Sequence, residues 1–312
     1  MVTLDIIRSA HERIRPFVHN TPVLTSRAID QMVDANVYFK CENLQKVGAF
    51  KARGAVNAVM QLDSATAARG VVTHSSGNHA QALAYAAKLR GIPCTIVMPH
   101  NAPTVKQDAV RDYGATIVLC EPTLRARLDA MQTIVTVTGA HPIPPYNDER
   151  VVAGQGTLAL EFVDQIDNLD VIMAPVGGGG LLSGVATAVR ALTGHIDIIG
   201  AEPEIAADAQ LSLKTGVLQP PADALTIADG LRTGLGDVTL AHLQQANVSI
   251  MTASEDGIRE ATYRIMERLK VVIEPSAGVT LAVMLENPGH WSGKNVGIVL
   301  CGGNIDIRRL PI

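Results

Sequence analysis

The sequence predicts an α/β fold of two domains, each a parallel β-sheet covered by helices. Apolar runs of strand length alternate along the chain with segments of helical periodicity, which is the βαβ pattern of parallel sheets. Small polar or glycine-rich clusters lie at the ends of several of these runs, at residues 75–78, 177–180, 202–208 and 301–304. Because ligands bind at the carboxyl ends of parallel strands, we expect these clusters to converge on one site.

Length and composition fit this fold and exclude several classes of protein. The chain has 312 residues, enough for two domains or one large α/β unit, and 47% of them are hydrophobic. A net charge of −4 without a long basic run argues against a nucleic-acid partner. The sequence shows no apolar stretch long enough to cross a bilayer and no apolar signal core near residue 1, so we expect no membrane association.

The cysteines indicate a reducing compartment. Cys41, Cys94, Cys120 and Cys301 lie far apart in the sequence and form no C-x-x-C pair. We therefore expect free thiols in a cytoplasmic protein.

The first sixty residues predict two helices with strands between them. Apolar residues recur at helical spacing over residues 3–15, which predicts an amphipathic helix. Strands are expected at residues 23–26 and 37–41, because these runs are rich in β-branched and aromatic residues. A loop then leads into a helix expected over residues 51–62.

The next segment alternates regularly and predicts a second sheet. Strands are expected at 70–73, 92–98 and 115–119, and helices at 80–91, 103–113 and 123–137. The proline-rich stretch His141–Tyr146 breaks this alternation and marks a domain boundary. We therefore predict a large domain formed by residues 1–60 and 149–312, and a small domain formed by residues 61–148.

The second half of the chain returns to the large domain. Gly154–Thr157 is expected to cap a helix over residues 158–166. A charged amphipathic helix is expected at residues 255–270. Strands are expected at residues 171–176, 196–201 and 296–300.

Four consecutive glycines, Gly177–Gly180, predict an anion site. They join the strand at 171–176 to a helix, so backbone N–H groups and the positive end of the helix meet at the turn. Glycines let the backbone close around an anion without interference from Cβ atoms. The pattern is neither G-x-G-x-x-G nor a P-loop, so it favours a phosphate group over a dinucleotide or a nucleoside triphosphate. The alternative is a tight loop without a ligand.

Lys51 is the second candidate functional residue. It follows Phe50 and opens an alanine-rich helix, and a lysine among apolar neighbours loses its proton more easily. An unprotonated amine can add to a carbonyl group. The alternative is a solvated lysine, which is the usual state of this residue.

Taken together, these stretches resemble the fold-type II pyridoxal-phosphate enzymes, which share the two-domain parallel-sheet fold of the tryptophan synthase β-subunit. The nearest group is that of serine racemases and serine/threonine dehydratases. The resemblance runs from Thr21 to Asn304 and covers nearly the whole chain. Its motifs are specific in combination: Gly48–Gly54, Ser75–His79, Gly154–Thr157, Gly177–Gly184, Glu202-Pro203, Glu274–Gly278 and Cys301–Asn304.

The resemblance implies a bound pyridoxal 5'-phosphate. Lys51 would form the Schiff base with its aldehyde and remove the substrate α-proton. Gly177, Gly178, Gly179, Gly180 and Leu181 would hold the phosphate group, in agreement with the glycine pattern. Further contacts with the cofactor are implied for Phe50 near its ring, Asn78 at its ring hydroxyl, Cys301 at its pyridine nitrogen, and Glu274.

The same resemblance implies substrate contacts from the Ser75–His79 turn, that is from Ser75, Ser76, Gly77, Asn78 and His79. Ser76 would be a second acid/base on the opposite face of the substrate, which racemisation requires. Arg127 would lie near an acidic substrate group. From the sequence alone, Ser75 and Asn78 could equally be helix caps, and Arg127 a solvated helix residue.

Two positions depart from the commonest family pattern. Cys301 and Ala49 stand where many relatives have serine. A thiol is a weaker hydrogen-bond partner than a hydroxyl, but a neutral group there would still leave the pyridine nitrogen unprotonated.

A divalent cation, Mg²⁺ or Mn²⁺, is also implied by the resemblance. Glu202, the backbone oxygen of Ala206 and Asp208 match the family site in the stretch EPEIAAD. Oxygen ligands suit such hard cations. The alternative is an acidic surface loop.

These features support three functional hypotheses. The first is an ammonia-lyase that converts L-serine, L-threonine or 3-hydroxyaspartate to a keto acid and ammonia, with racemase activity beside it. The second is a racemase with elimination as a side reaction, and the third is a non-catalytic protein that binds a phosphate ligand. The family also implies a homodimer and an amino acid as the substrate.

Overall fold

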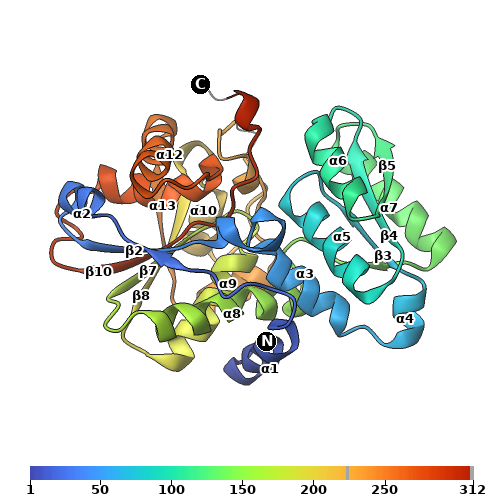
Figure 1. The fold of residues 1–312 in the computed structure, drawn as a ribbon, viewed down its shortest axis with the longest axis horizontal. Coiled ribbons are helices and arrows are strands. Elements are labelled where there is room, and N and C mark those ends of the chain that lie inside the picture. Colours follow the sequence, from blue (N-terminus) through green and yellow to red (C-terminus); the bar gives the residue numbers. More distant parts are fainter. Residues whose placement is uncertain (223–224, 310–312) are drawn as a thin grey trace.

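In the computed structural model, residues 1–222 and 225–309 are described, and they form two β-sheets flanked by helices. The larger body and the smaller body lie side by side, with α3 (Lys51–Met60) between them (Figure 1). The predicted α/β class with parallel sheets is confirmed.

The larger sheet has six strands in the order β1-β2-β10-β7-β8-β9. All neighbouring strands pair in parallel except β1, which runs antiparallel to β2. The strands are β1 (Val23–Leu24), β2 (Asn36–Lys40), β7 (Val171–Pro175), β8 (Asp197–Pro203), β9 (Ser249–Ala253) and β10 (Asn295–Val299).

Helices cover both faces of this sheet (Figure 1). On one face, α9 packs on β7 and β8, and α8 and α1 pack against α9. On the other face, α13 packs on β7, β8, β9 and β10 and also contacts α12. The bounds are α1 (Leu4–Ile14), α2 (Arg27–Val33), α8 (Glu149–Gln165), α9 (Gly180–Leu192), α10 (Asp208–Thr215), α11 (Asp237–Gln245), α12 (Glu255–Leu269) and α13 (Pro275–Glu286).

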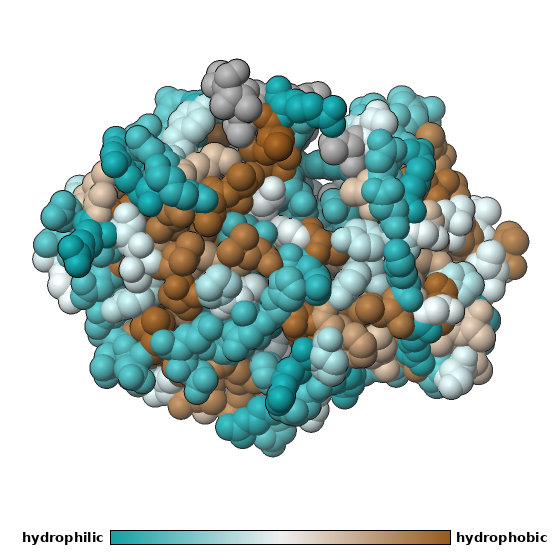
Figure 2. Space-filling model, viewed as in Figure 1, coloured by the Kyte–Doolittle hydropathy of each residue, from teal (hydrophilic) through white to brown (hydrophobic). Residues whose placement is uncertain are grey.

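The smaller sheet has four parallel strands in the order β5-β4-β3-β6. In space-filling form the surface is hollowed between this body and the larger one, near their upper edges (Figure 2). The elements are β3 (Val71–His74), β4 (Cys94–Pro99), β5 (Thr116–Cys120), β6 (His141–Pro142), α4 (Ser64–Ala68), α5 (Asn78–Arg90), α6 (Thr104–Asp112) and α7 (Leu124–Thr138).

The helix α1 contributes to both hydrophobic cores, and α3 joins the smaller core to the larger body. Ile7 and Ala10 of α1 belong to the core of the larger sheet, whereas Ile14 of the same helix belongs to the core of the smaller one. Val56 and Val59 of α3 pack in the smaller core, although α3 also contacts α8. The predicted domain division at residues 60/61 and 148/149 stays a prediction, because α1 belongs to both cores and α3, which the division assigns to the large domain, packs in the smaller core.

One sequence prediction was wrong. Gly154–Thr157 does not cap a helix but lies inside α8, which begins at Glu149 and is capped by the side chain of Asp148. The glycines serve close packing instead. A Cβ at Gly154 would lie 2.6 Å from the carbonyl oxygen of Arg53, and a Cβ at Gly156 would lie 2.8 Å from the carbonyl oxygen of Gly184.

Several elements carry weak sequence signals and were not predicted, among them α2, α4, α10, α11, α13 and β9. The helix α13 follows a helix-start rule, since Pro275 is its first residue. In the described part of the chain, no helix is both long and apolar enough to span a membrane.

Candidate active site

The glycine run forms the turn between β7 and α9, and its backbone is closely surrounded. Gly179 has a φ of +84°, which favours glycine. A Cβ at Gly178 would lie 2.2 Å from Cδ1 of Tyr146, so the Tyr146 ring packs directly on the loop. The hydroxyl of Thr239 donates a hydrogen bond to the Gly178 carbonyl (2.9 Å). The loop therefore has a fixed shape with its N–H groups at the start of α9.

Lys51 is the first residue of α3, and its amine is enclosed by protein groups. Its Nζ donates to the carbonyl oxygen of Pro145 at 2.7 Å and lies 5.0 Å from the centre of the Phe50 ring. Burial lowers the pKa of the amine to about 8, against smaller raising effects of Cys301 and Glu274. About a tenth of the amine is therefore unprotonated at pH 7.

The lysine and the glycine run border the same short segment of chain. Pro145 accepts the hydrogen bond from Lys51, and the next residue, Tyr146, packs on Gly178. The amine and the anion-binding turn therefore lie in one region of the molecule, as the glycine and lysine patterns require for a ligand that contacts both.

Asn78, Glu274 and Asn304 form a hydrogen-bonded cluster between the two bodies. The Asn78 amide donates to both carboxylate oxygens of Glu274 (2.9 and 3.1 Å), and the Asn304 amide donates to Asn78 Oδ1 (2.8 Å). Burial raises the pKa of Glu274 to about 7, although the bond from Asn78 lowers it. Both the nitrogen and the oxygen of the Asn78 amide are therefore hydrogen-bonded to protein groups.

Cys301 follows β10 and is buried next to Lys51 and Glu274. Its carbonyl accepts a hydrogen bond from the N–H of Phe50 (3.0 Å), which joins it to the start of α3. Burial and the Glu274 carboxylate raise the pKa of the Cys301 thiol well above its usual value. The side chain is therefore a neutral thiol at physiological pH.

The Ser75–Gly77 turn connects β3 to α5 and is partly open. A Cβ at Gly77 would meet no atom within 4 Å, and Ser75 and Ser76 are half-buried. Burial lowers the pKa of His74, and the charge of Arg127, which lies nearby on α7, lowers it further. Within the described residues no carboxylate lies within 4.0 Å of the Arg127 guanidinium. The structure thus leaves this cation without an ion-pair partner near Ser75 and Ser76.

His79 lies in the first turn of α5 and is 2% exposed. Its Nε2 lies 2.9 Å from the carbonyl oxygen of Ile143, and burial and the Lys51 charge lower its pKa to about 3. The residues of the Ser75–His79 motif therefore differ in their partners. The side chains of Asn78 and His79 bond to other parts of the protein, whereas the Ser75 hydroxyl accepts only from the N–H of Gly77 within the turn.

Glu202 and Asp208 form a buried acidic pair near the glycine turn. Glu202 lies one residue before the end of β8, and its carboxylate accepts from the N–H groups of Ala209 and Gln210 at 2.8 and 3.0 Å. Burial raises the pKa of Glu202 to about 8 and also raises that of Asp208. Asp208 Oδ2 is buried without a hydrogen-bond partner among the described residues.

This pair is connected to the rest of the candidate site through Tyr146, whose pKa is raised by burial and by the charge of Asp208. No group of three or more His, Cys, Asp or Glu side chains with metal-binding geometry occurs in the part of the chain that the structure describes. A cation here would therefore need backbone oxygen, such as that of Ala206, and water as further ligands.

Two residues contribute to the site without having been predicted from the sequence. Tyr146 was assigned only to a domain boundary, and Thr239 was not singled out. A possible signal for Tyr146 was an aromatic residue directly after two prolines, since such a ring has a well-fixed backbone position. Thr239 carries no signal in the sequence, because only the approach of α11 to the glycine turn gives its hydroxyl a role.

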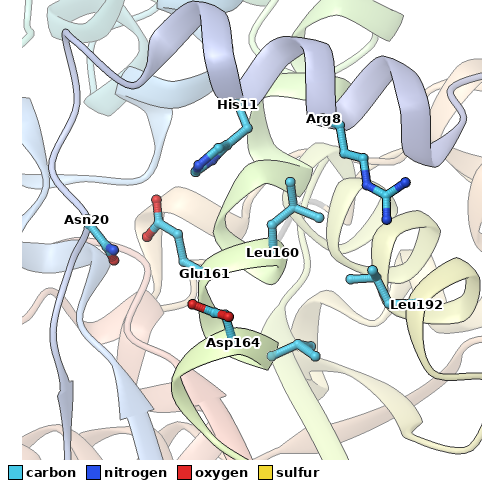
Figure 3. Close-up of a pocket in the computed structure, with 8 residues that line it drawn as sticks. Arg8, His11, Asn20, Leu160, Glu161, Asp164 and Leu192 are labelled. Carbon is cyan, nitrogen blue, oxygen red and sulfur yellow. The ribbon is translucent and has the colours of Figure 1, made fainter.

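A separate cavity of about 450 Å³ lies between α1 and α8, away from these groups (Figure 3). His11, Asn20 and Glu161 point toward it from three segments of the chain. None of the residues that line it is a predicted site residue, and Glu161 is already paired with Lys40 and Arg53. We do not assign the cavity to the site.

Comparison with known proteins explains this arrangement. Residues 14–302 match the model of a family described as pyridoxal-phosphate dependent enzyme. The chain belongs to this family. The prediction made from the sequence motifs is confirmed, and so is the fold that it implies.

Similar members of the pyridoxal-phosphate dependent enzymes align over nearly their full length. A beta-hydroxyaspartate dehydratase of Paracoccus denitrificans is 47% identical over 309 residues, which is 99% of this chain and 98% of that one. A serine racemase of Dictyostelium discoideum is 44% identical and covers 99% of this chain and 97% of its own. The solved structure of maize serine racemase matches with a TM-score of 0.96 and 42% identity, over 98% of this chain and 95% of that one.

The residues present fit a pyridoxal phosphate. The glycine turn presents backbone N–H groups at the start of α9, as a phosphate group requires, and it must lack side chains, since a Cβ at Gly177 would lie 2.9 Å from the Leu231 backbone. The Lys51 amine, with its lowered pKa, is the nucleophile that an aldehyde needs. The orphaned oxygen of Asp208 likewise fits a hard divalent cation.

Proposed function

We propose that this protein is a pyridoxal-phosphate dependent ammonia-lyase for β-hydroxy amino acids. The observation that carries the proposal is that one segment, Pro145-Tyr146, contacts both the amine of Lys51 and the glycine turn. The proposal is also supported by the 47% identity to a beta-hydroxyaspartate dehydratase. The candidate substrates are L-serine, L-threonine and 3-hydroxyaspartate.

Each proposed role follows from the environment of the residue. Lys51 would hold the cofactor through its amine and then, once freed by the substrate, take the α-proton on Nζ; its lowered pKa keeps part of it unprotonated for this purpose. The N–H groups of Gly177–Gly180 and Leu181 would bind the phosphate, and Phe50 would pack near the ring. When bound, pyridoxal phosphate supplies an electron sink for the negative charge left at the substrate α-carbon.

Cys301 would face the ring nitrogen, with Glu274 beside it. Because the thiol stays neutral, it would leave that nitrogen unprotonated. An unprotonated ring would limit the build-up of negative charge at the substrate α-carbon and so favour prompt loss of the β-hydroxyl. Asn78 would bond the ring hydroxyl, which requires its amide to leave its present partner on Glu274 or Asn304.

The substrate would bind at the Ser75–His79 turn. Its α-carboxylate would lie at the Ser75–Gly77 turn, near the Ser76 hydroxyl and the start of α5. Arg127, which has no ion-pair partner within the described residues, would bind a second carboxylate. This arrangement favours 3-hydroxyaspartate among the three substrates, because only this one carries a carboxylate on its side chain.

The test is a product assay with L-serine, L-threonine and L-threo-3-hydroxyaspartate. We expect keto acid and ammonia in equal amounts, fastest with the dicarboxylate, and no product from Lys51→Ala. Replacing Arg127 by Met should weaken selection for 3-hydroxyaspartate while leaving turnover of L-serine. A wild-type protein that shows no lysine-dependent visible absorption would instead support a protein that only binds a phosphate ligand.

Racemisation is the second candidate activity, and Ser76 is the residue that favours it. Ser76 is half-buried in the partly open turn, and its hydroxyl makes no hydrogen bond within the described residues, so it is free to exchange a proton with the substrate. We expect Ser76→Ala to abolish the D-enantiomer while elimination from the L-enantiomer continues. Equal loss of both products would remove Ser76 from this role.

The proposal includes a Mg²⁺ or Mn²⁺ ion at Glu202, the Ala206 carbonyl and Asp208. It is supported by the two buried carboxylates and the orphaned Asp208 oxygen. Cation binding should raise the melting temperature of the wild type, because the ion would bind the folded protein and not the unfolded chain. Asp208→Asn should remove this increase, and Asp306→Asn, which is outside the proposed ligand set, should retain it.

A homodimer in the cytoplasm, with the domain division given by the sequence, completes the proposal. The homodimer is supported by the likeness to the family, and the compartment by four cysteines that are all free thiols. Light scattering coupled to size exclusion would measure the mass in solution, and a monomer would contradict the first point.

A further inference from the structure

The segment Ile143–Asn147, which we call the strap, connects β6 to α8 and touches both the lysine and the glycine turn of the candidate site. It contacts His79 at one end, Lys51 in the middle, and the glycine turn and α11 at the other end. These contacts come from different elements, so the strap is where their positions are fixed relative to one another.

His79 holds the first end of the strap. A carbonyl oxygen can only accept, so the Nε2 that lies 2.9 Å from the Ile143 oxygen must carry the ring hydrogen. The ring is neutral, because burial lowers its pKa to about 3. Its Nδ1 is therefore an unprotonated acceptor, and it is buried without a partner among the described residues. The hydrogen bond to Ile143 is thus the single directional contact of this side chain.

Two prolines transmit this position to Lys51. Ile143 is followed by Pro144 and Pro145, whose rings fix φ and leave the segment few alternative conformations. The carbonyl of Pro145, two residues beyond that of Ile143, accepts the hydrogen bond from Lys51 Nζ (2.7 Å). A displacement of Ile143 therefore carries the Pro145 carbonyl with it.

The second end of the strap is held independently. Asn147 accepts from the N–H of Val238 (3.0 Å) and donates to the carboxylate of Asp237 (2.7 Å), while Tyr146 packs on Gly178. The glycine turn has its own support in the bond from Thr239. Loss of the His79 contact would therefore release the lysine end and leave the phosphate end in place.

We propose that the strap sets the position of the Lys51 amine relative to the glycine turn, and that His79 is a positioning residue for this amine. The inference rests on the proposed role of Lys51 as the residue that holds pyridoxal phosphate. Other groups around the amine are the Phe50 ring, the thiol of Cys301 and the carboxyl of Glu274. Glu274, which accepts from Asn78 of α5, lies near the amine without a hydrogen bond to it, and α3 itself packs on α5. Among the described residues, the strap is therefore the one route by which hydrogen bonds connect the Lys51 amine to α5.

Two probes separate the ends of the strap. Pyridoxal 5'-phosphate is captured when Lys51 Nζ forms a C=N bond with the aldehyde carbon and the aldehyde oxygen leaves as water. Pyridoxine 5'-phosphate carries an alcohol in place of the aldehyde, so its binding reports the glycine turn without the amine. The proteins are the full chain freed of cofactor, as wild type, His79→Leu, His79→Gln and His242→Leu. His242 is a similarly buried histidine, on α11, and serves as the matched control.

We expect His79→Leu to capture pyridoxal phosphate roughly tenfold more slowly or worse, since small displacements of a reacting group have large effects on rate. Its affinity for pyridoxine phosphate should be unchanged. His79→Gln keeps an N–H donor and should recover much of the rate, and His242→Leu should match the wild type in both measurements. Capture by His79→Leu at the wild-type rate, or parallel loss of capture and of pyridoxine phosphate binding, overturns the inference.

A second variant covers the case in which His79→Leu does not fold. Pro144→Gly keeps every hydrogen bond of the strap and removes only its stiffness, so it should also slow capture with normal pyridoxine phosphate binding. Unchanged capture by Pro144→Gly in a folded protein overturns the inference as well. A wild type that captures no pyridoxal phosphate on Lys51 would refute the proposed function itself, which is a different result.

Discussion

At the scale of single residues, burial determines the chemistry of Lys51. A lysine in water has a pKa near 10.5, and burial lowers that of Lys51 to about 8. The amine donates a hydrogen bond to the carbonyl oxygen of Pro145, but within the described residues no carboxylate forms an ion pair with it. The environment therefore makes the neutral amine accessible without forbidding the charged one.

This environment predicts a pH dependence for cofactor capture. The neutral amine is the reactive form, so the rate for the cofactor-free protein should rise with pH up to about 8 and then level off. At pH 7 only about a tenth of the amine is neutral. Stopped-flow absorbance would measure the rate, with a blocked lysine in solution as the control, whose rate keeps rising to much higher pH. A protein profile like that of the control would contradict the pKa.

Arg53, two residues after Lys51, belongs to a buried network of charges. Its guanidinium bonds both carboxylate oxygens of Glu42 and both of Glu161, and Lys40 pairs with Glu161 as well. Burial alone would lower the pKa of Arg53, and the two carboxylates raise it instead. The network joins α3, β2 and α8 around two cations and two anions, so its net charge is zero.

Removing one member should therefore be costly. Arg53→Met leaves two buried carboxylates with only Lys40 between them, and we expect a loss of about 3–5 kcal/mol in the free energy of unfolding. Urea denaturation would measure it. Arg125→Met, which breaks an exposed pair with Asp129, should change stability by less than about 1 kcal/mol. Similar values for the two variants would show that the buried network is not stabilising.

At the scale of elements, glycines allow α8 to approach its neighbours. A Cβ at Gly184 of α9 would lie 2.4 Å from the carbonyl oxygen of Val152 and 2.5 Å from the backbone nitrogen of Gly156, both in α8. A Cβ at Gly154 would lie 2.6 Å from Gly54 of α3. These atoms belong to backbones, which cannot move aside as a side chain can. The close packing of α3, α8 and α9 therefore requires glycine at these positions.

Gly184→Ala should destabilise the protein, although alanine is the better helix former by about 1 kcal/mol. The clash with the α8 backbone should cost about 1–3 kcal/mol, and α9, which begins at the glycine turn, should shift with it. Chemical denaturation would give the sign. Ala191→Ser, at an exposed position of the same helix, is the control and should have little effect. A stabilised Gly184→Ala would show that helix propensity outweighs the packing clash.

At the scale of the whole molecule, α1 and α3 tie the two bodies together. Each helix packs in the core of the smaller sheet and also contacts α8 of the larger body. Hydrogen bonds from Asn78 and Asn304 and the ion pair between Lys106 and Asp229 (3.0 Å) cross between the bodies on the side of the candidate site. The two sheets therefore share structure on either side of the site.

This sharing predicts that the two cores unfold together. Trp291, the only tryptophan of the chain, is fully buried in the larger core, and Cys94 is buried in the smaller one. Tryptophan fluorescence and the labelling of Cys94, mapped by mass spectrometry, should therefore give the same midpoint in urea. Labelling of Cys94 well before the fluorescence change would show instead that the smaller body unfolds on its own.

Local sequence signals were sufficient for the main elements of the fold. The strands at β3, β4, β5, β7 and β10 and the helices α1, α3, α5, α7 and α12 follow from periodicity and β-propensity, with ends shifted by a few residues. Elements with mixed or weakly periodic sequences, such as α10, α11 and β9, were not predictable in this way. The wrong prediction of a helix cap at Gly154–Thr157 has a related cause. In the sequence, glycines inside a helix are typical of a helix end, and only the neighbouring helix shows that they serve packing.

The sequence by itself determined which chemistry is available: a lysine that opens an apolar helix, four glycines between a strand and a helix, and two acidic residues after another strand. Such signals are local, because propensity and hydrophobic spacing act between near neighbours in the chain. Tertiary structure alone decided that Pro145 and Tyr146 join the lysine to the glycines, that His79 bonds Ile143, and that burial brings the Lys51 pKa to about 8. These contacts link residues far apart in sequence, and desolvation depends on everything packed around a group, so neither is encoded at any single position.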